Sequence, residues 1–396
     1  MLTPAQAETL IEQHLSCLPI ESLPLTQAAG AVLRENIYAE RDQPPFDRVA
    51  MDGIALMSGG TQTGRLRVCG TQAAGDPPAR LTDPEGCIEI MTGAMLPQGC
   101  DAVVSVEQIR RAGEFAEIGR KTISPWQNVH RRGSDCPQGA LLLPAGTRLS
   151  APEVAIAAGA GMARLRVSAQ PMIVVISTGN ELVEPGEIIE PHQVRRSNAY
   201  GITASLRQHG FNRVSDDHVR DDEAELTERL GFHLRTHDVL ILSGGVSMGK
   251  LDLVPQVLEK LGVSMVFHHV AQRPGKPMWF GVSHTGPAVF ALPGNPVSTL
   301  MCLARYVLPA LRAAMGQAPR DPMRISIDSP VEVKVPLAFF MPVTLKTDEW
   351  GRTSAQPRPT NGSGDFTSLA GTDGFVELPP GPGTFPKGFV ARFFRW

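Results

Sequence analysis

The 396-residue sequence has no large excess of either charge, because its formal net charge is -3. Proteins that bind nucleic acid or membrane surfaces through their overall charge carry a marked positive excess, so neither partner is expected. The sequence also has no apolar run of membrane-spanning length and no basic-then-apolar leader. We therefore expect a soluble, cytoplasmic protein.

Cysteine pairs of the metal-binding kind are also missing. The six cysteines form no C-x-x-C pair, and a chain that is 42% hydrophobic can bury several cores without disulfides. We expect reduced thiols and no structural zinc. The histidines do not cluster either. His268 and His269 are adjacent, and alternation along a strand would let only one of them face a pocket.

Turn-forming residues are plentiful, with 39 glycines and 34 prolines, and short strands between them indicate β domains. Residues 45–138 carry short strands only, which predicts a small β domain inserted into another domain. Residues 1–44 and 139–171 would form that other, discontinuous N-terminal domain. Its signals are a helix after Thr3 and Pro4 and a capping box from Ser150 to Glu153.

Strands and helices alternate through residues 172–318, which predicts a three-layer α/β domain with a parallel sheet. Residues 319–396 return to short β segments with proline and glycine turns, which predicts a barrel-like or sandwich-like C-terminal β domain. The expected fold class is therefore α/β plus β, spread over several domains.

Two strand–loop–helix units organise the α/β region. The first runs from a strand at 239–242 into the glycine-rich loop SGGVSMG, with Asp252 as the expected N-cap of the next helix. The second runs from a strand at 288–292 through PGNP, with Asn295 as N-cap, into a helix that ends at Gly316. Helix N-termini at the carboxyl edge of a parallel sheet favour anionic ligands. Arg273 and Lys276 add positive charge between the two loops.

Motifs along the whole chain resemble the MoeA/gephyrin E-domain family, whose members insert molybdenum into the pterin cofactor. The motifs occur in the family's order: PPFD-x-x-AMDG, MTGAMLPQG, RRGSD, STGNEL, SGGVSMG, RPGKP and LPGNPVS. The resemblance implies an elongated four-domain homodimer, with the discontinuous N-terminal domain as the dimerisation domain. It places the active site between the α/β domain of one subunit and the inserted β domain of the other.

The resemblance also implies the chemistry. The substrates would be adenylylated molybdopterin and molybdate, the product would be the molybdenum-bearing cofactor with release of AMP, and Mg²⁺ or a similar divalent ion would assist. A molybdopterin adenylyltransferase and acceptor molybdoenzymes are the implied protein partners. Carboxylates suit the divalent ion, and helix N-termini with a lysine suit molybdate and phosphate.

Matching motif positions gives the candidate site residues. The catalytic candidates are Asp52, Glu181, Asp252 and Lys276, and the metal candidates are Asp52, Asp135, Glu181 and Asp222, with Asp221 as a neighbour of equal standing. The substrate-binding candidates are Thr92, Gly244, Gly245, Ser247, Gly249, Arg273, Gly275, Pro293, Gly294, Asn295, Pro296, Ser363 and Ser368.

Several candidates have a purely structural alternative. Asp52 could close an Asx turn, Asp135 could pair with Arg131 or Arg132, and Asp252 could only cap its helix. The aspartates at 221 and 222 could start a helix, the serines at 363 and 368 could cap turns, and the lysine at 276 could be solvated.

The sequence departs from the family pattern at positions that bear on activity. Asn180, Arg196 and Lys250 stand where the family usually has acidic residues, Arg48-Val49 interrupts the first motif, and 340–342 lacks a common arginine. We expect these changes to weaken cation binding and to strengthen anion binding. They motivate an alternative function, a non-catalytic paralogue that binds molybdopterin and hands it over. A scaffold protein would require that the α/β region lack a ligand site.

Overall fold

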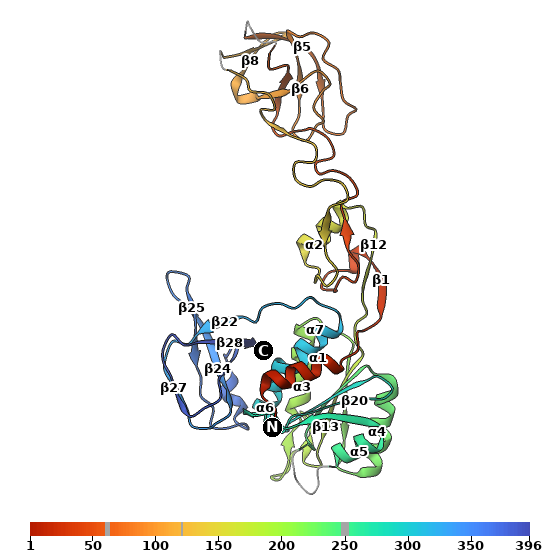
Figure 1. Cartoon of the computed structure of the whole chain (residues 1–396), viewed down its shortest axis with the longest axis vertical. Coiled ribbons are helices and arrows are strands. Elements are labelled where there is room, and N and C mark those ends of the chain that lie inside the picture. Colours follow the sequence, from red (N-terminus) through yellow and green to blue (C-terminus); the bar gives the residue numbers. More distant parts are fainter. Residues whose placement is uncertain (60–63, 120–121, 247–252) are drawn as a thin grey trace.

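The structure is a computed structural model that describes residues 1–59, 64–119, 122–246 and 253–396. The chain is elongated. A small β domain with β5, β6 and β8 lies at one end, and the α/β and C-terminal β domains lie at the other (Figure 1). A narrow region with α2 and β12 joins them. The multidomain α/β plus β class is confirmed.

The first helix belongs with the α/β domain. Helix α1 (Pro4–His14) begins at Thr3, whose hydroxyl accepts a hydrogen bond from Gln6 N while the Gln6 side chain accepts from Thr3 N. Its buried residues Ala7 and Ile11 belong to the main α/β core cluster, and Figure 1 shows α1 against α7. The expectation that α1 packs with residues 139–171 is therefore wrong.

The narrow region brings two distant segments together. Strand β1 (Ile20–Pro24) pairs with β12 (Arg164–Ser168), and β2 (Ile37–Tyr38) pairs with β11 (Leu141–Leu143). Helix α2 (Ala151–Gly159) starts at the predicted capping box, in which Glu153 accepts from Ser150 N at 2.8 Å. A 3-10 turn, Leu25–Gln27, completes the region. Through these pairings, chain segments on either side of the inserted strands lie together.

The inserted β domain is a six-stranded sheet in the order β7, β4, β6, β5, β9, β8. The strands are β4 (Gly53–Leu56), β5 (Arg65–Gln72), β6 (Gly86–Ile90), β7 (Ala102–Ser105), β8 (Ile109–Ala112) and β9 (Phe115–Ile118), with a 3-10 turn at Val106–Gln108. Strand β3 (Arg48–Val49) pairs with β10 (Val129–His130) at its base. Gly53 of the AMDG motif is required by packing, because a Cβ there would meet Val104 O at 1.9 Å.

The α/β sheet has six strands in the order β16, β13, β17, β21, β20, β18. They are β13 (Ile173–Thr178), β16 (Val214–Val219), β17 (Val239–Ser243), β18 (Val263–His268), β20 (Trp279–Ser283) and β21 (Ala288–Leu292). The first four in sheet order are parallel, but β20 is antiparallel to both its neighbours. The five strands β16, β13, β17, β21 and β18 run in the same direction and confirm the predicted parallel sheet, while β20, which is not among the predicted strands, runs antiparallel between β21 and β18. Only residues 284–287 join β20 to β21, and so short a link permits a hairpin and no parallel crossover.

Helices cover both faces of this sheet, as the three-layer prediction requires. Alternate residues of β13 and β17 enter two core clusters, one under α1, α3 and α7 and the other under α4 and α5. The helices are α3 (Ser197–Gln208), α4 (Glu223–Thr236), α5 (Val254–Lys260), α6 (Pro296–Cys302), a π-helical segment (Leu303–Val307) and α7 (Leu308–Ala314). The stretch Pro296–Ala314 has the length and hydropathy of a membrane span, but 78% of it is buried in the core.

The helix starts test the two predicted caps. Asn295 occupies the N-cap position of α6 and Pro296 is its first residue, as predicted. Gly316 follows α7 with a φ of +74°, which suits a helix terminator. Leu253 occupies the N-cap position of α5, and Asp252, predicted there, lies outside the described residues.

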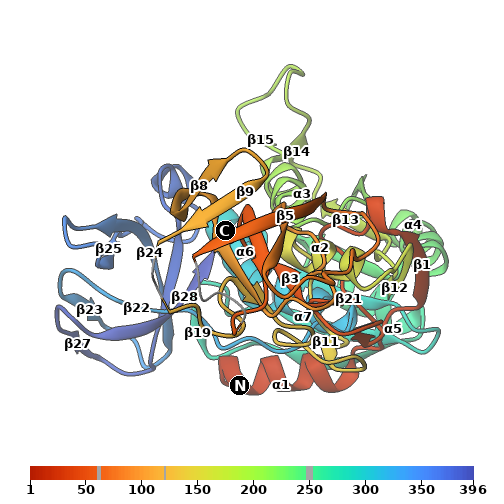
Figure 2. The ribbon, with the colours of Figure 1, turned by 90° about the horizontal axis from the view of Figure 1, so that it is seen from above.

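The C-terminal domain consists of short strands, as predicted. They are β22 (Arg324–Ser326), β23 (Val331–Val333), β24 (Ala338–Thr347), β25 (Thr353–Pro357), β26 (Gly374–Leu378), β27 (Gly383–Phe385) and β28 (Val390–Arg395), with a 3-10 turn at Phe366–Leu369. Strand β19 (Gln272–Arg273) of the α/β domain joins this sheet in parallel with β24. Figure 2 shows the C-terminal strands on one side of the molecule and α4 and α5 on the other.

Candidate active site at the sheet edge

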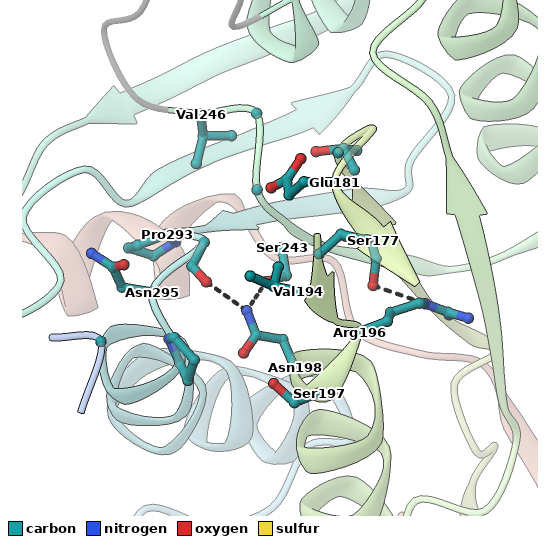
Figure 3. A pocket seen from close by; sticks show the side chains of 18 of the residues that line it. Ser177, Glu181, Val194, Arg196, Ser197, Asn198, Ser243, Val246, Pro293 and Asn295 are labelled. Atoms are coloured by element: carbon teal, nitrogen blue, oxygen red, sulfur yellow. Dashed lines mark hydrogen bonds between the residues drawn. The ribbon is translucent and has the colours of Figure 1, made fainter. Parts of the chain in front are cut away.

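Two adjoining clefts contain most of the predicted site. The first, here called the sheet-edge cleft, measures about 890 Å³ and lies where β13, β17 and β21 end (Figure 3). The short pair β14 (Leu182–Val183) and β15 (Val194–Arg195) and the start of α3 form its other wall. This is the edge at which open α/β sheets bind ligands. Predicted residues in this cleft are Glu181, Gly244, Gly245, Pro293, Gly294, Asn295 and Pro296.

Asn198 joins the two ligand loops and was not predicted. Its Nδ2 donates to Ser243 Oγ at 2.8 Å and to Gly294 O at 2.7 Å, so one amide connects the end of β17 with the PGNP loop (Figure 3). A sequence shows that an asparagine stands at the start of a helix, but it does not show which loops that amide reaches.

The glycine-rich turn packs directly against the end of β13. A Cβ on Gly244, whose φ is +103°, would meet Thr178 O at 2.6 Å, and one on Gly245 would meet Val254 Cγ2 at 2.7 Å. Both positions therefore require glycine. Thr178 Oγ1 is buried and has no hydrogen-bond partner among the described residues, which leaves a polar group available to a ligand. Ser247 and Gly249 lie outside the described residues.

Two carboxylates line the sheet-edge cleft. Glu181 is exposed there, and Asp221 lines the same cleft, with its backbone N–H donating to Asn180 Oδ1 at 3.1 Å. Asp222 instead caps α4, because its side chain accepts from Glu225 N at 2.9 Å. The cleft therefore takes its second described carboxylate from Asp221. Asp252 lies outside the described residues.

Arg196 lines the same cleft but is buried, and its charge is compensated within the protein. Its guanidinium pairs with Glu184, lies 2.6 Å from Asp216 and donates to Ser177 Oγ at 3.2 Å. Burial lowers the pKa of Arg196, but the two carboxylates outweigh burial and raise it. The hydrogen bond from Arg196 lowers the pKa of Glu184. The expectation that this departure adds anion-binding charge is therefore wrong at Arg196, and Lys250 lies outside the described residues.

The second cleft, here called the interdomain cleft, measures about 770 Å³ and lies between the α/β and C-terminal domains. Pro277, Pro293 and Asn295 line both clefts, so the two adjoin. Asn295 also bridges the domains, because its Nδ2 donates to Ser363 Oγ at 2.8 Å. Further residues of this cleft are Arg273, Gly275, Lys276, Ser298, Glu332 and Lys334, and the 340–342 segment that lacks the family arginine.

Positive charge dominates the interdomain cleft. Its only carboxylate among the described lining residues, Glu332, lies 3.9 Å from Lys334 Nζ. Arg273 and Lys276 are exposed and have no ion-pair partner among the described residues. Lys276 was expected between the two glycine loops, and the structure places it in this second cleft. Unpaired cations that face a cleft favour an anionic ligand.

Ser363 and Ser368 separate in the structure. Ser363 lines the interdomain cleft, whereas the Ser368 hydroxyl bonds to the carboxylate of Asp365 and lines neither cleft. Asp365 also accepts from Asn361 N at 2.9 Å, and hydrogen bonds, first that of Ser368, lower the pKa of Asp365 to about 2. Ser368 therefore has the turn-capping role, which was its structural alternative.

The candidates of the inserted domain lie far from both clefts of their own chain (Figure 1). Asp52 accepts from Thr92 N at 2.6 Å and from Thr92 Oγ1 at 2.7 Å, and these bonds lower the pKa of Asp52. Asp135 lies 2.7 Å from His130 Nε2, and neither neighbouring arginine is its ion-pair partner among the described residues. These residues reach a cleft only if a second copy of the chain supplies one.

The expectation that His268 and His269 alternate along one strand is wrong. Strand β18 ends at His268, and His269 has a φ of +74°, so alternation stops there and the two rings stack at 3.9 Å. Within the described part of the chain, no three His, Cys, Asp or Glu side chains group as a metal site. Glu181 and Asp221 are the two described carboxylates of the sheet-edge cleft. Two carboxylates are enough for a Mg²⁺ ion whose other ligands are phosphate and water.

Comparison with known families finds three matches, in chain order. They are described as "MoeA N-terminal region (domain I and II)" over residues 2–161, "Probable molybdopterin binding domain" over 174–313 and "MoeA C-terminal region (domain IV)" over 334–393. Together they follow the order of the domains described above.

Individual relatives match along the whole chain. The molybdopterin molybdenumtransferase of Synechocystis sp. is 39% identical over 400 residues, which cover 100% of both chains. That of Haemophilus influenzae is 32% identical and covers 98% of this chain and 97% of its own. A crystal structure of the molybdopterin biosynthesis MoeA protein from Pyrococcus horikosii superposes with a TM-score of 0.82 at 30% identity, covering 100% and 99% of the two chains.

Proposed function

The chain belongs to the MoeA family, and from that premise we propose that it inserts molybdate into adenylylated molybdopterin with release of AMP. It is an enzyme of molybdenum cofactor biosynthesis, a molybdopterin molybdenumtransferase like the relatives that match its full length. The observation that carries the proposed reaction is the pair of adjoining clefts, of which one lies at the sheet edge beside the glycine-rich turn and the other contains Arg273 and Lys276, which have no ion-pair partner among the described residues.

Charge divides the substrates between the clefts. Molybdate is a dianion and suits the interdomain cleft, where Arg273 and Lys276 have no described ion-pair partner. The phosphorylated pterin suits the sheet-edge cleft, where Thr178 Oγ1 has no hydrogen-bond partner among the described residues and Arg195 has no ion-pair partner among them. Asn295, which lines both clefts, would lie near the point where the substrates meet.

The attacking group is molybdate itself, and no side-chain nucleophile is required. The pterin sulfurs replace oxygen ligands of molybdate, and one displaced oxygen is added, as water, across the phosphoanhydride, so that the pterin keeps one phosphate and AMP is released with the other. The residues orient the two anions and stabilise the negative charge that develops on phosphate. A divalent ion would neutralise phosphate charge when bound, and Glu181 and Asp221 are the described residues that would hold it.

AMP release tests the proposal directly. Purified protein is incubated with adenylylated molybdopterin, molybdate and Mg²⁺, and AMP is measured by chromatography. We expect Lys276→Ala and Glu181→Gln to lower the rate by roughly 100-fold, the usual effect of removing one electrostatic contact at a reacting phosphate or carbonyl. Lys346→Ala is the matched control, because Lys346 is exposed on β24 and lines neither cleft. Wild-type protein that released no AMP would contradict the proposal.

The carrier alternative predicts tight binding of the adenylylated pterin without turnover. Asn180 motivates it, since an amide there replaces a family carboxylate and accepts from Asp221 N. Asn180→Asp should raise AMP release if the lost charge limits activity. Arg196→Asp should not, because it would place a third carboxylate beside Glu184 and Asp216.

A shared site in a homodimer would explain why Asp52 lies so far from the clefts of its own chain. Chains with Asp52→Asn and chains with Lys276→Ala can be unfolded, mixed and refolded together. Random pairing makes half of the dimers hybrids with one intact site each, so activity should return to about a quarter of wild type. No recovery from properly folded hybrids would exclude the shared site.

The enzyme would act in the cytoplasm, receive its substrate from a molybdopterin adenylyltransferase and pass its product to acceptor molybdoenzymes. Co-purification of the full-length protein with each partner, in the presence and absence of the pterin, would test these contacts.

A further inference from the structure

A fully buried arginine lies where three regions of the chain meet. Arg305 is 0% exposed and sits in the π-helical segment Leu303–Val307, between α6 and α7. Such π segments inside α-helices occur often at functional sites. Asn295, the N-cap of α6, lines both clefts, so the π-helical segment continues the helix that starts at the PGNP loop.

The partners of Arg305 come from α1 of the α/β domain and from the C-terminal sheet. Its Nη2 lies 3.0 Å from Glu8 Oε2 on α1, and its Nε lies 2.8 Å from Glu377 Oε2 on β26. The ring of Phe394 on β28 lies 4.9 Å from the guanidinium carbon. Arg392 also pairs with Glu8 at 3.3 Å. One guanidinium therefore connects α1, the α6–α7 helix and the C-terminal sheet.

The next residue continues the connection to the cation loop. The Tyr306 hydroxyl donates to Gln272 Oε1, and Gln272 Nε2 donates to Gly275 O at 3.1 Å. Tyr306 and Gln272 are both buried. Gly275 is closely packed, because an added Cβ would lie 2.7 Å from Cys302 Sγ and 2.7 Å from Gln272 Nε2. Lys276 follows directly, so its backbone is fixed by these contacts.

This arrangement has little value as a simple source of stability. Burying an ion pair costs hydration free energy that the attraction between the two charges barely offsets. Apolar residues in the same place often give equal or greater stability. One nitrogen of Arg305, Nη1, also has no partner among the described residues. A buried charge that fixes one relative placement of its partners is the better-supported role.

We propose that Arg305 and Tyr306 are positioning residues for the anion subsite: Arg305 holds the C-terminal sheet over the interdomain cleft, and Tyr306, through Gln272, holds the Lys276 loop against it. This rests on the proposed function, because it assumes that the interdomain cleft binds molybdate. Neither residue lines either cleft, so any effect on ligands must pass through the residues they hold.

Tyr306→Phe is the decisive variant because it removes one buried hydroxyl and keeps the ring. Gln272 can then rotate, which releases the Gly275 carbonyl. We expect molybdate binding to the full-length protein, measured by titration calorimetry, to weaken roughly ten-fold, the equivalent of one hydrogen bond. KM for molybdate should rise while KM for the adenylylated pterin changes little. Tyr38→Phe is the matched control, because the Tyr38 hydroxyl bonds only to Asn36 among the described residues.

Arg305→Met should weaken molybdate binding at least as much as Tyr306→Phe does. If Arg305→Met does not fold, Tyr306→Phe still tests the inference. A purely structural role predicts a lower melting temperature with unchanged molybdate affinity, which would overturn the inference. Two different results would contradict the proposed function itself. The wild-type protein would bind no molybdate, or the Lys276→Ala variant would bind molybdate as tightly as the wild type. If molybdate binding depends on Lys276 but not on Tyr306, the positioning role alone is refuted.

Discussion

Replacing Asn198 tests whether one amide sets the shape of the sheet-edge cleft. In Asn198→Ala, the hydrogen bonds to Ser243 Oγ at 2.8 Å and to Gly294 O at 2.7 Å are both lost. The ends of β17 and β21 then lose the side chain that joins their loops. The predicted consequence is a wider range of loop positions and weaker substrate binding.

The magnitude follows from two lost hydrogen bonds. Each is worth about 0.5–1.5 kcal/mol, so the loss lies between about 1 and 3 kcal/mol. If the whole loss appears in binding, affinity for AMP or the adenylylated pterin falls by about 5-fold to 150-fold. If the loops relax without moving away from the ligand, the loss appears in the free energy of unfolding instead. Calorimetric titration and urea unfolding on the same preparation separate these outcomes.

Two further variants make the result decisive. Asn212→Ala is the control, because Asn212 is exposed and its side chain has no hydrogen bond among the described residues. Asn198→Asp keeps the size but replaces the donor with an acceptor that faces Gly294 O, so it should bind more weakly than the alanine variant. Wild-type affinity in Asn198→Asp would refute the reasoning, because no donor would then be needed.

Three other outcomes follow from buried or charged side chains. Arg196→Met should lower the free energy of unfolding by about 1–2 kcal/mol, since it removes hydrogen bonds to two carboxylates that remain partly hydrated, and an unchanged urea midpoint would contradict this. Burial raises the pKa of Asp217, but hydrogen bonds from His233 and Arg229 outweigh it and lower that pKa. This stabilisation is complete above the ordinary Asp pKa and is lost as pH falls toward the lowered value, so Asp217→Asn should flatten the acid side of the stability–pH profile. Burial raises the pKa of Cys302 to about 12, so mass spectrometry after iodoacetamide at pH 8 should find the exposed cysteines alkylated and Cys302 intact.

Local signals in the sequence predicted helix starts accurately. Asn295 and Pro296 start α6 as expected, and the capping box at Ser150 starts α2. Both depend on residues within one helical turn of the boundary, so the sequence contains all the necessary information. Strand direction depends on a partner elsewhere in the chain. The antiparallel β20 is missing from the predicted strands, although the four-residue link 284–287 between it and β21 is a hairpin signal that the sequence does contain.

Charges were the least predictable part of the site. The sequence shows that Arg196 replaces an acidic residue, but not that Glu184 and Asp216 neutralise it. Lys276 lies in the RPGKP motif, which is easy to recognise in the sequence. The cleft that Lys276 lines, however, depends on the pairing of β19 with β24 of the C-terminal domain. A charge has a predictable effect only when its partners are known, and those partners here are separated from it by many residues.

The two clefts differ in how they can hold negative charge. In the sheet-edge cleft, Glu181 and Asp221 add negative charge, Arg196 is neutralised, and Arg195 is the cation that has no ion-pair partner among the described residues. Under the proposed function, phosphate there would be held by Arg195, by backbone N–H groups and by a divalent ion from solution. In the interdomain cleft, Arg273 and Lys276 supply fixed positive charge. A divalent ion should therefore support the nucleotide side of the reaction, while molybdate binding depends on how firmly the protein holds its own cations. If the inference about Arg305 and Tyr306 holds, changes at these two buried residues should weaken the binding of molybdate and leave the binding of the adenylylated pterin nearly unchanged.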